Sequence, residues 1–332
     1  MKARRETLLA VIILALVVGV GLRAPAFVTP PSLLGVLTDT SPLFMLTLAQ
    51  MGVLLTRGID LSVAANLALT GMVAGLVNHA APGLPILAII ALAIVFGAVL
   101  GLVNATLIAG LGIPPIVVTL GTLAIFRGAI FLIARGAWLT SKDMSPAFLA
   151  TPKAQFLGLS SLVWIAAAVA IGAWIFLNHT AAGRALYAVG GNPVAARYCG
   201  IDLARQQLIV YVVSGAVSGL CGYLWVSRYG IAYSDIALGY ELTVIAACVI
   251  GGVSIAGGVG SVPGALLGAL FLGVIVNALP VINVSPFWQM AISGAVILAA
   301  VIVNSRSEWS GGKLILPEAR RKAASASGAA AS

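Results

Sequence analysis

Long apolar stretches fill this chain from Leu8 to Val303, and the breaks between them are short and rich in glycine or basic residues. A helix needs roughly 20 mainly apolar residues to cross the hydrocarbon of a membrane. Only 8% of the residues are charged and 61% are hydrophobic, whereas a typical soluble domain carries about a quarter charged residues. The chain is therefore predicted to be an all-α integral membrane protein.

The apolar stretches leave room for about ten transmembrane helices. The predicted windows are 8–22, 42–56, 61–77, 85–108, 116–134, 161–178, 207–226, 242–256, 262–279 and 286–303. The region 42–77 is open to two interpretations, because Arg57-Gly58-Ile59-Asp60 fits a tight loop or a break inside one hairpin. These windows divide the chain into a cytoplasmic segment 1–7, a transmembrane domain 8–303 and a tail 304–332, which ends in small polar residues and is expected to be partly disordered.

Positive charge is spread unequally over the predicted breaks. The formal net charge is +9, but no basic stretch is interleaved with aromatic residues as a nucleic-acid surface would require. With the amino terminus inside, the outer breaks hold only Arg23, Arg135, Lys142, Lys153 and Arg228. Cytoplasmic loops are enriched in Lys and Arg, so we expect a multi-pass protein of the inner (plasma) membrane with both termini in the cytoplasm.

Two segments of the chain share one pattern. Gly58–Ala65 aligns with Gly239–Ala246 as glycine, acid, leucine, hydroxyl and valine, and the following helices open with Gly97–Gly101 and Gly264–Gly268. The copies lie five spans apart, so they cross the membrane in opposite directions. An inverted repeat of this kind is typical of transporters that open alternately to either side. Small residues four positions apart also indicate close helix packing; the pairs are Gly71/Gly75, Gly97/Gly101, Gly215/Gly219 and Gly264/Gly268.

Three charged residues come nearest to the membrane interior. Asp60 and Glu241 stand at helix starts, where an acid suits the helix dipole, although carboxylates at this depth also serve ion-coupled carriers. Arg127 falls inside a span, where a guanidinium needs a partner or water. It is expected to pair with Asp60 or Glu241, unless its helix ends early at the outer interface. We assign all three a structural role.

Uncharged polar residues inside the spans are candidates for contact with a neutral, hydroxyl-rich solute. Amide and hydroxyl groups can exchange hydrogen bonds with a sugar without a counter-charge, and they can equally join helices to one another. The candidates for the solute path are Asn66, Asn104, Thr119, Thr122, Asn277 and Gln289. The two histidines and three cysteines are too scattered to predict a metal site or a catalytic cluster, so no enzyme is expected.

No phosphate-binding loop is found: Gly311-Gly312-Lys313-Leu314 lacks the leading glycine and the following Ser or Thr. ATP, if it drives the protein, must be bound by a partner. The longest inner break, 180–207, offers a docking segment, because Asn192-Pro193 is a good helix start and Gly200 a good stop. One short helix is predicted there, with Gly190, Gly191, Asn192, Ala195, Ala196, Gly200 and Ile201 as the residues that couple it to an ATPase.

At these residues the chain resembles permeases of bacterial ABC importers for ribose-type sugars, a superfamily that includes autoinducer-2 permeases. The resemblance covers nearly the whole chain. Its matching segments are Arg57–Val63, Ile113–Leu123, Gly190–Ile201 and Ala246–Gly268. The segments around Trp138, Trp225–Tyr229 and Ser285–Met290 look most like rhamnose permeases, with autoinducer-2 permeases as the close second.

The resemblance implies a permease that moves a monosaccharide-like solute, rhamnose first and ribose or autoinducer-2 as alternatives, by alternating access. It also implies partners: two ATPase chains, a second permease copy or a sister permease, and a periplasmic sugar-binding protein. Gly190–Ile201 would dock in the ATPase. An ion-coupled secondary carrier remains the alternative class.

Overall fold

The computed structural model describes residues 2–285, 288, 291, 294–295 and 298. Within them the chain is mostly helical. The helices are α1 (Lys2–Arg23), α2 (Pro30–Leu55), α3 (Val63–Ala80), α4 (Ile86–Ala105), α5 (Pro115–Ala134), α6 (Pro146–Ala150), α7 (Ser161–His179), α8 (Ala181–Gly191), α9 (Pro193–Tyr198), α10 (Leu203–Tyr229), α11 (Tyr240–Ile250) and α12 (Val262–Val281). The predicted all-α class is confirmed.

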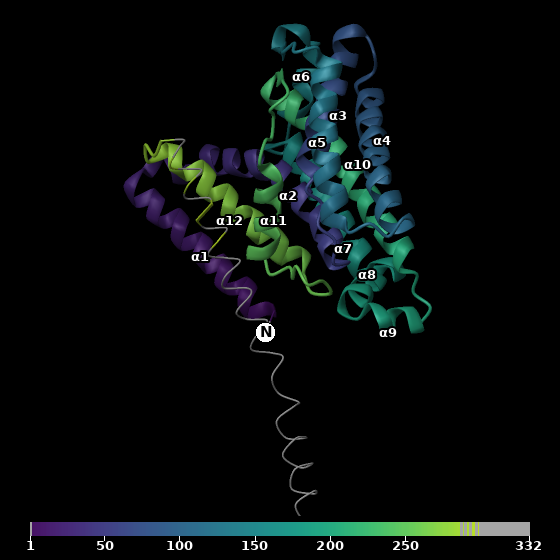
Figure 1. The fold of residues 1–332 in the computed structure, drawn as a ribbon. Helices are drawn as coiled ribbons and strands as arrows, with labels where there is room; N and C mark the ends of the chain where they lie inside the picture. The colour runs from purple at the N-terminus through teal and green to yellow at the C-terminus, as the bar shows by residue number, and fades with distance from the viewer. Residues whose placement is uncertain (1, 286–287, 289–290, 292–293, 296–297, 299–332) are drawn as a thin grey trace, which may run out of the picture.

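Eight of the described helices are long and apolar enough to cross a membrane, and α11 is a shorter apolar helix. The predicted window 286–303 lies almost wholly outside the described residues. In Figure 1 the amino terminus and helices α8 and α9 lie at the lower end of the molecule, and α6 lies at the opposite, upper end. We call these the inner and outer ends.

The uncertain region 42–77 consists of two helices joined by a turn. α2 begins at Pro30, earlier than the predicted window, and two prolines occupy its first turn. Its polar residues remain helical because Thr38, Thr40 and Ser41 donate their hydroxyls to carbonyls four residues earlier. The chain then turns through residues 56–62 before α3.

Helices α2 and α10 form the centre of the bundle. α10 packs against α3, α4 and α2, and α2 packs against α11, α12 and α10. These neighbours correspond under the five-span offset, since α10 follows α2 by five spans, α11 follows α3 and α12 follows α4. α3 leaves the inner end and α11 arrives there, so the two copies run in opposite directions (Figure 1).

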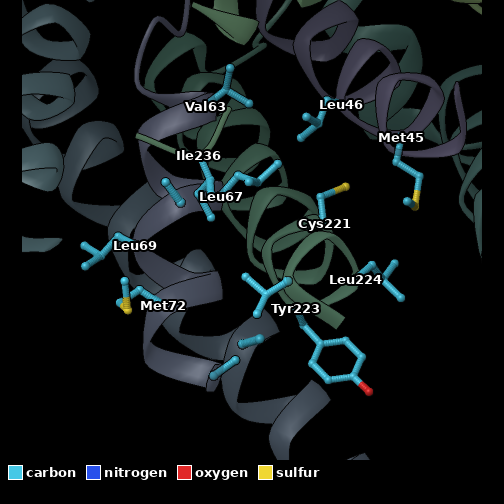
Figure 2. Packing of buried hydrophobic residues seen from close by; sticks show 14 of the residues in the cluster. Met45, Leu46, Val63, Leu67, Leu69, Met72, Cys221, Tyr223, Leu224 and Ile236 are labelled. Atoms are coloured by element: carbon cyan, nitrogen blue, oxygen red, sulfur yellow. The ribbon is translucent and has the colours of Figure 1, made fainter. Parts of the chain in front are cut away.

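The predicted glycine pairs bring helices into backbone contact. A Cβ atom added at Gly97 would meet the Gly215 carbonyl and Gly219 Cα, and one at Gly71 would meet the Gly222 carbonyl. Helices approach this closely only where side chains are absent. Beside this seam, side chains of α2, α3 and α10 form a buried apolar core that includes Leu46, Leu67 and Tyr223 (Figure 2).

Two short antiparallel strand pairs lie at the outer end. β1 (Leu139–Thr140) pairs antiparallel with β4 (Ile231–Ala232), and β2 (Gln155–Phe156) with β3 (Leu159–Ser160). The Asn78 side chain at the end of α3 donates to Ser145 Oγ and accepts from the Ser145 N–H. These bonds fasten the long α5–α7 connection to the bundle.

Candidate solute path and coupling segment

Asp60 lies in the turn between α2 and α3 and is 3% exposed. One carboxylate oxygen accepts the Ser62 N–H at 2.9 Å and the Ser62 hydroxyl at 2.6 Å. The other accepts the Ser214 hydroxyl of α10 at 3.1 Å. Three donors therefore take the place that Arg127 was expected to fill, and Asp60 is not paired with a cation.

Four of the predicted polar residues lie near this turn. Asn104 Nδ2 of α4 donates to Ser62 Oγ at 2.8 Å, and its Oδ1 accepts the Thr122 hydroxyl of α5 at 2.7 Å. Thr119 donates to the Ile59 carbonyl at 3.1 Å, and Asn66 donates to the Gly97 carbonyl at 3.1 Å. We name the set Asp60, Ser62, Asn66, Asn104, Thr119, Thr122 and Ser214 the inner polar cluster.

Every side chain of the inner polar cluster is buried, and the hydrogen bonds described above join helices to one another or to the turn. Asn66 Oδ1 is buried with no hydrogen-bond partner within the part of the chain that the structure describes. In this arrangement the cluster fixes the α2–α3 turn to α4, α5 and α10. Contact of these residues with a transported solute remains a prediction.

Sequence reasoning did not single out Ser62, Ser214 or Gln50. The Gln50 amide faces the Asp60 main chain and, oriented to satisfy both groups, donates to its carbonyl and accepts from its N–H at 3.2 Å. Ser62 was part of the repeated motif, so its nearness to Asp60 could have drawn attention to it. Nothing in the sequence places Ser214 or Gln50 beside an acid in a distant segment.

The other two path candidates are not part of this cluster. Asn277 of α12 is half-buried and donates to the Gly273 carbonyl of its own helix at 2.9 Å. Gln289 lies outside the described residues.

Arg127 reaches from α5 to the outer connection between α10 and α11. Its guanidinium donates to the carbonyls of Ser234 at 3.0 Å, Ile236 at 2.8 Å and Ala237 at 3.2 Å. Asp235 and Glu241 are the acids whose charges act on it. The helix does not end early, since α5 continues to Ala134; the outer connection instead supplies carbonyl oxygens as the partners of the guanidinium.

The break 180–207 holds two helices, where one was predicted. The predicted helix is α9, whose cap is Asn192 accepting from the N–H groups of Val194 and Ala195. The additional helix, α8, is capped by Thr180, whose hydroxyl accepts the Gly183 N–H. A Thr180 cap followed by eleven residues of helix-compatible sequence was the signal available for it.

The exposed face of α9 is defined by Val194 and Tyr198, and Tyr198 is 88% exposed. Ala196, one of the predicted coupling residues, is 4% exposed and faces the protein. Exposed large apolar side chains on a short helix at the inner end suit contact with another protein. In the part of the chain that the structure describes, no group of His, Cys, Asp or Glu could hold a metal ion.

These features define a class: a polytopic α-helical permease built from two oppositely directed copies of one unit, with a short helical segment between them at one end. Residues 32–301 match the family model described as branched-chain amino acid transport system / permease component. The chain belongs to this family of membrane permeases, and as a permease subunit it is a transport protein and not an enzyme.

Curated relatives match over most of their length. The ribose import permease protein of Escherichia coli (strain K12) is 35% identical over 308 residues, 92% of this chain and 94% of the relative. The autoinducer 2 import system permease protein of Enterobacter sp. (strain 638) is 36% identical over 283 residues, 85% of this chain and 81% of the relative. The galactose/methyl galactoside import permease protein of Haemophilus influenzae is 34% identical over 296 residues, 85% of this chain and 88% of the relative. No solved structure matches the chain.

Proposed function

We propose that this chain is the membrane permease of an ATP-driven importer for a monosaccharide-like solute, which it moves inward by alternating access. The observation that carries the proposal is the capped helix pair α8–α9 between the two repeats, with apolar side chains exposed at the inner end. Such a face suits a partner that supplies the driving force, and the chain has no phosphate-binding loop of its own.

Rhamnose is the first candidate for the solute, on the resemblance of the segments around Trp138, Trp225–Tyr229 and Ser285–Met290. Ribose and autoinducer-2 are the alternatives, and the names of the relatives support a small hydroxyl-rich solute. The uncharged amides and hydroxyls within the spans fit such a solute better than an ion.

The proposed assembly contains two permease chains, identical or paired with a sister permease, two ATPase chains that bind ATP, and a periplasmic solute-binding protein. This chain then sits in the bacterial inner membrane with α8, α9 and both termini on the cytoplasmic side. Gly190–Ile201 is the segment that meets the ATPase.

Uptake of labelled L-rhamnose, ribose and autoinducer-2 in a strain lacking this chain tests the proposal. Loss of one uptake, restored by the chain, identifies the solute. Uptake that persists without the ATPase but collapses when the proton gradient is dissipated would overturn the ATP-driven mechanism in favour of an ion-coupled carrier. Equal uptake of all three with and without the chain would overturn the solute class.

The docking face can be tested by co-purification of the ATPase. Tyr198→Glu and Val194→Glu place a charge on the exposed face of α9 and should abolish co-purification while membrane insertion is unchanged. Ala204→Glu is the control. Ala204 is exposed at the inner end of α10, so this variant should leave co-purification unchanged, whereas Leu208→Glu would place its charge within a span. Normal capture by both α9 variants would refute docking there.

Orientation can be tested with a native residue. Cys199 at the end of α9 is exposed, whereas Cys221 and Cys248 are buried. A membrane-impermeant thiol reagent should therefore label the protein in inside-out vesicles and leave it unlabelled in right-side-out vesicles. Lys142→Cys in a Cys199→Ser background should give the reverse pattern, and labelling of both sites from one side would refute the topology.

A further inference from the structure

Arg57 holds an unusual backbone position at the inner end of α2. Its φ is +64°. This is the left-handed conformation that closes many helices, and the residue that adopts it there is usually glycine. The Arg57 N–H bonds to the Leu54 carbonyl and the Gly58 N–H to the Val53 carbonyl, which is the bond pattern of a Schellman motif. Glycine would close this helix with less strain, so the arginine side chain itself needs an explanation.

The Arg57 side chain caps a second helix, 133 residues later in the chain. Its Nε donates to the Gly190 carbonyl at 2.8 Å and its Nη2 to the Gly191 carbonyl at 3.1 Å. These are the last two carbonyls of α8, and a cation at a helix C-terminus is favourable both as a donor and for the helix dipole. The contact fixes the end of α2 to the residues that lead directly into α9.

A third segment, the connection between α11 and α12, contacts both the end of α2 and α8. The Gly258 N–H, in the connection between α11 and α12, donates to the Leu55 carbonyl at 3.1 Å. The Tyr187 hydroxyl of α8 donates to the Gly260 carbonyl at 3.4 Å. We call the meeting of residues 55–58, 190–191 and 257–260 the three-way junction.

Backbone packing makes the three-way junction stiff. A Cβ atom at Gly190 would collide with the Leu55 carbonyl and the Gly258 N, and one at Gly258 would lie 2.5 Å from the Gly191 N. Gly257 and Gly258 both have positive φ, which non-glycine residues adopt at a cost. The three segments therefore cannot slide past one another without breaking the Gly258–Leu55 backbone bond and the side-chain bonds of Arg57 and Tyr187.

We propose that Arg57 is a positioning residue that makes α8 and α9 move as one unit with both repeats. α2 and α3 belong to the first repeat and α11 and α12 to the second, and the three-way junction joins an end of each to the root of α9. A displacement of α9 by its partner then reaches both halves together. This inference rests on the proposed function, since it concerns how that partner's work is transmitted.

The decisive variant is Arg57→Gly in the assembled transporter, with its ATPase and binding protein, in proteoliposomes. Glycine relieves the left-handed backbone but removes the two bonds to α8. We expect normal membrane insertion, normal ATPase co-purification and continued ATP hydrolysis, with at least about a tenfold loss of solute moved per ATP, the effect of about 1.4 kcal/mol of lost coupling. Arg57→Lys keeps the positive charge on a single ammonium group and should restore part of the lost solute moved per ATP.

Arg135→Gly is the matched control. Arg135 closes α5 at the outer end with φ +51°, its side chain is exposed, and it makes no side-chain hydrogen bond or ion pair within the described residues. Replacing it relieves the same backbone strain without touching the junction, so solute moved per ATP should match the wild type. A wild-type ratio in Arg57→Gly would overturn the inference while leaving the proposed function intact. A wild-type complex that fails to bind the ATPase would instead remove the proposed function, and the inference with it.

A distance measurement tests the same idea without transport. Spin labels at Ala188 of α8 and Ile255 of the α11–α12 connection, both exposed, are placed in a Cys199→Ser background of the complex. Their separation should be the same without nucleotide and with ATP trapped, and should differ between the two states in Arg57→Gly. A separation that changes between the states in the otherwise wild-type junction would show that the three segments move independently and would overturn the proposal.

Discussion

The two copies of the repeated motif form turns at opposite ends of the molecule and are held in different ways. In the inner turn, Asp60 is buried and accepts three hydrogen bonds from Ser62 and Ser214. In the outer turn, the equivalent Glu241 is half-buried at the start of α11. The N-cap of α11 is Gly239, which has the left-handed conformation and provides no side-chain cap.

The outer turn is instead held from outside the repeat. Arg127 of α5 binds three of its carbonyls, and β4 at its beginning pairs with β1. The inner turn is thus stabilised by its own acid within a buried cluster, and the outer turn by one cation and a two-residue ladder near the surface. The two copies share a turn that leads into a helix, but not the interactions that stabilise that turn.

This difference predicts which of the two turns is released more easily. A turn held by several buried bonds opens only at high cost, because each buried group left unpaired costs about 1–3 kcal/mol. A turn held largely by one guanidinium can be released by the movement of a single helix, α5. We therefore expect the outer turn to be the more mobile of the two during transport.

The largest expected effect is that of Asp60→Ala. It leaves the Ser62 N–H and the Ser62 and Ser214 hydroxyls without an acceptor in a buried site, so the free energy of unfolding should fall by about 3–5 kcal/mol. Glu241→Ala should lower it by less than about 1 kcal/mol, the usual value of an acid at a helix N-terminus. Thermal unfolding of the purified protein in detergent measures both changes.

Asp60→Asn serves as the control, because it keeps an acceptor oxygen and should fall between the wild type and Asp60→Ala. If yield prevents purification, the fraction of folded protein in membranes gives the same order. Equal losses for Asp60→Ala and Glu241→Ala would break the comparison between the turns.

The second effect concerns Arg127. Arg127→Met keeps an apolar side chain of similar reach but removes three charge-assisted bonds, so amide hydrogen exchange in residues 231–239 should accelerate by about 10–100-fold. Exchange in the inner turn, residues 56–62, should not change. Arg127→Lys retains a cation with fewer aligned donors and should give a smaller acceleration; unchanged exchange in Arg127→Met would show that other contacts hold the outer turn.

Much of this architecture was predictable from local signals. The glycine pairs Gly97/Gly101 and Gly215/Gly219 do pack against each other, and Asn192 does cap α9, because small-residue spacing and helix caps depend on neighbouring residues. The direction of the repeat followed from counting apolar stretches. The early start of α2 was missed because Thr38, Asp39 and Ser41 lower its hydropathy, although backbone carbonyls satisfy the hydroxyls.

The contacts across the sequence were not predictable in the same way. Arg127 was expected to pair with a carboxylate, but it donates to backbone carbonyl oxygens. A bent backbone segment can supply such acceptors whatever its residue types are, so the sequence does not reveal them. Asp39 pairs with Arg228 at 2.8 Å, and Arg57 reaches α8, because the fold brings segments more than a hundred residues apart together. Residue type shows that such a group needs a partner, but not which segment provides it.

The smallest effect concerns Asp143, which supports the outer ladder. Its carboxylate accepts the Thr140 N–H at 2.8 Å and the Thr140 hydroxyl at 2.9 Å, and these bonds lower the pKa of Asp143 below its ordinary value. A lowered pKa in the folded protein means that the stabilisation is complete above the ordinary pKa, about 4, and is lost as the pH falls through the lowered value.

Hydrogen exchange of the Thr140 amide, corrected for its intrinsic pH dependence, should therefore show protection at neutral pH that disappears in strong acid. Asp143→Asn should exchange faster than the wild type at neutral pH and show little of this dependence, while exchange in residues 56–62 stays the same. Because both bonds lie at the exposed surface, water competes for them and the change should be only a few-fold. If the protection of the Thr140 amide does not vary with pH, β1 is held by its pairing with β4 alone. Asp143 would then make no contribution to the stability of the outer turn.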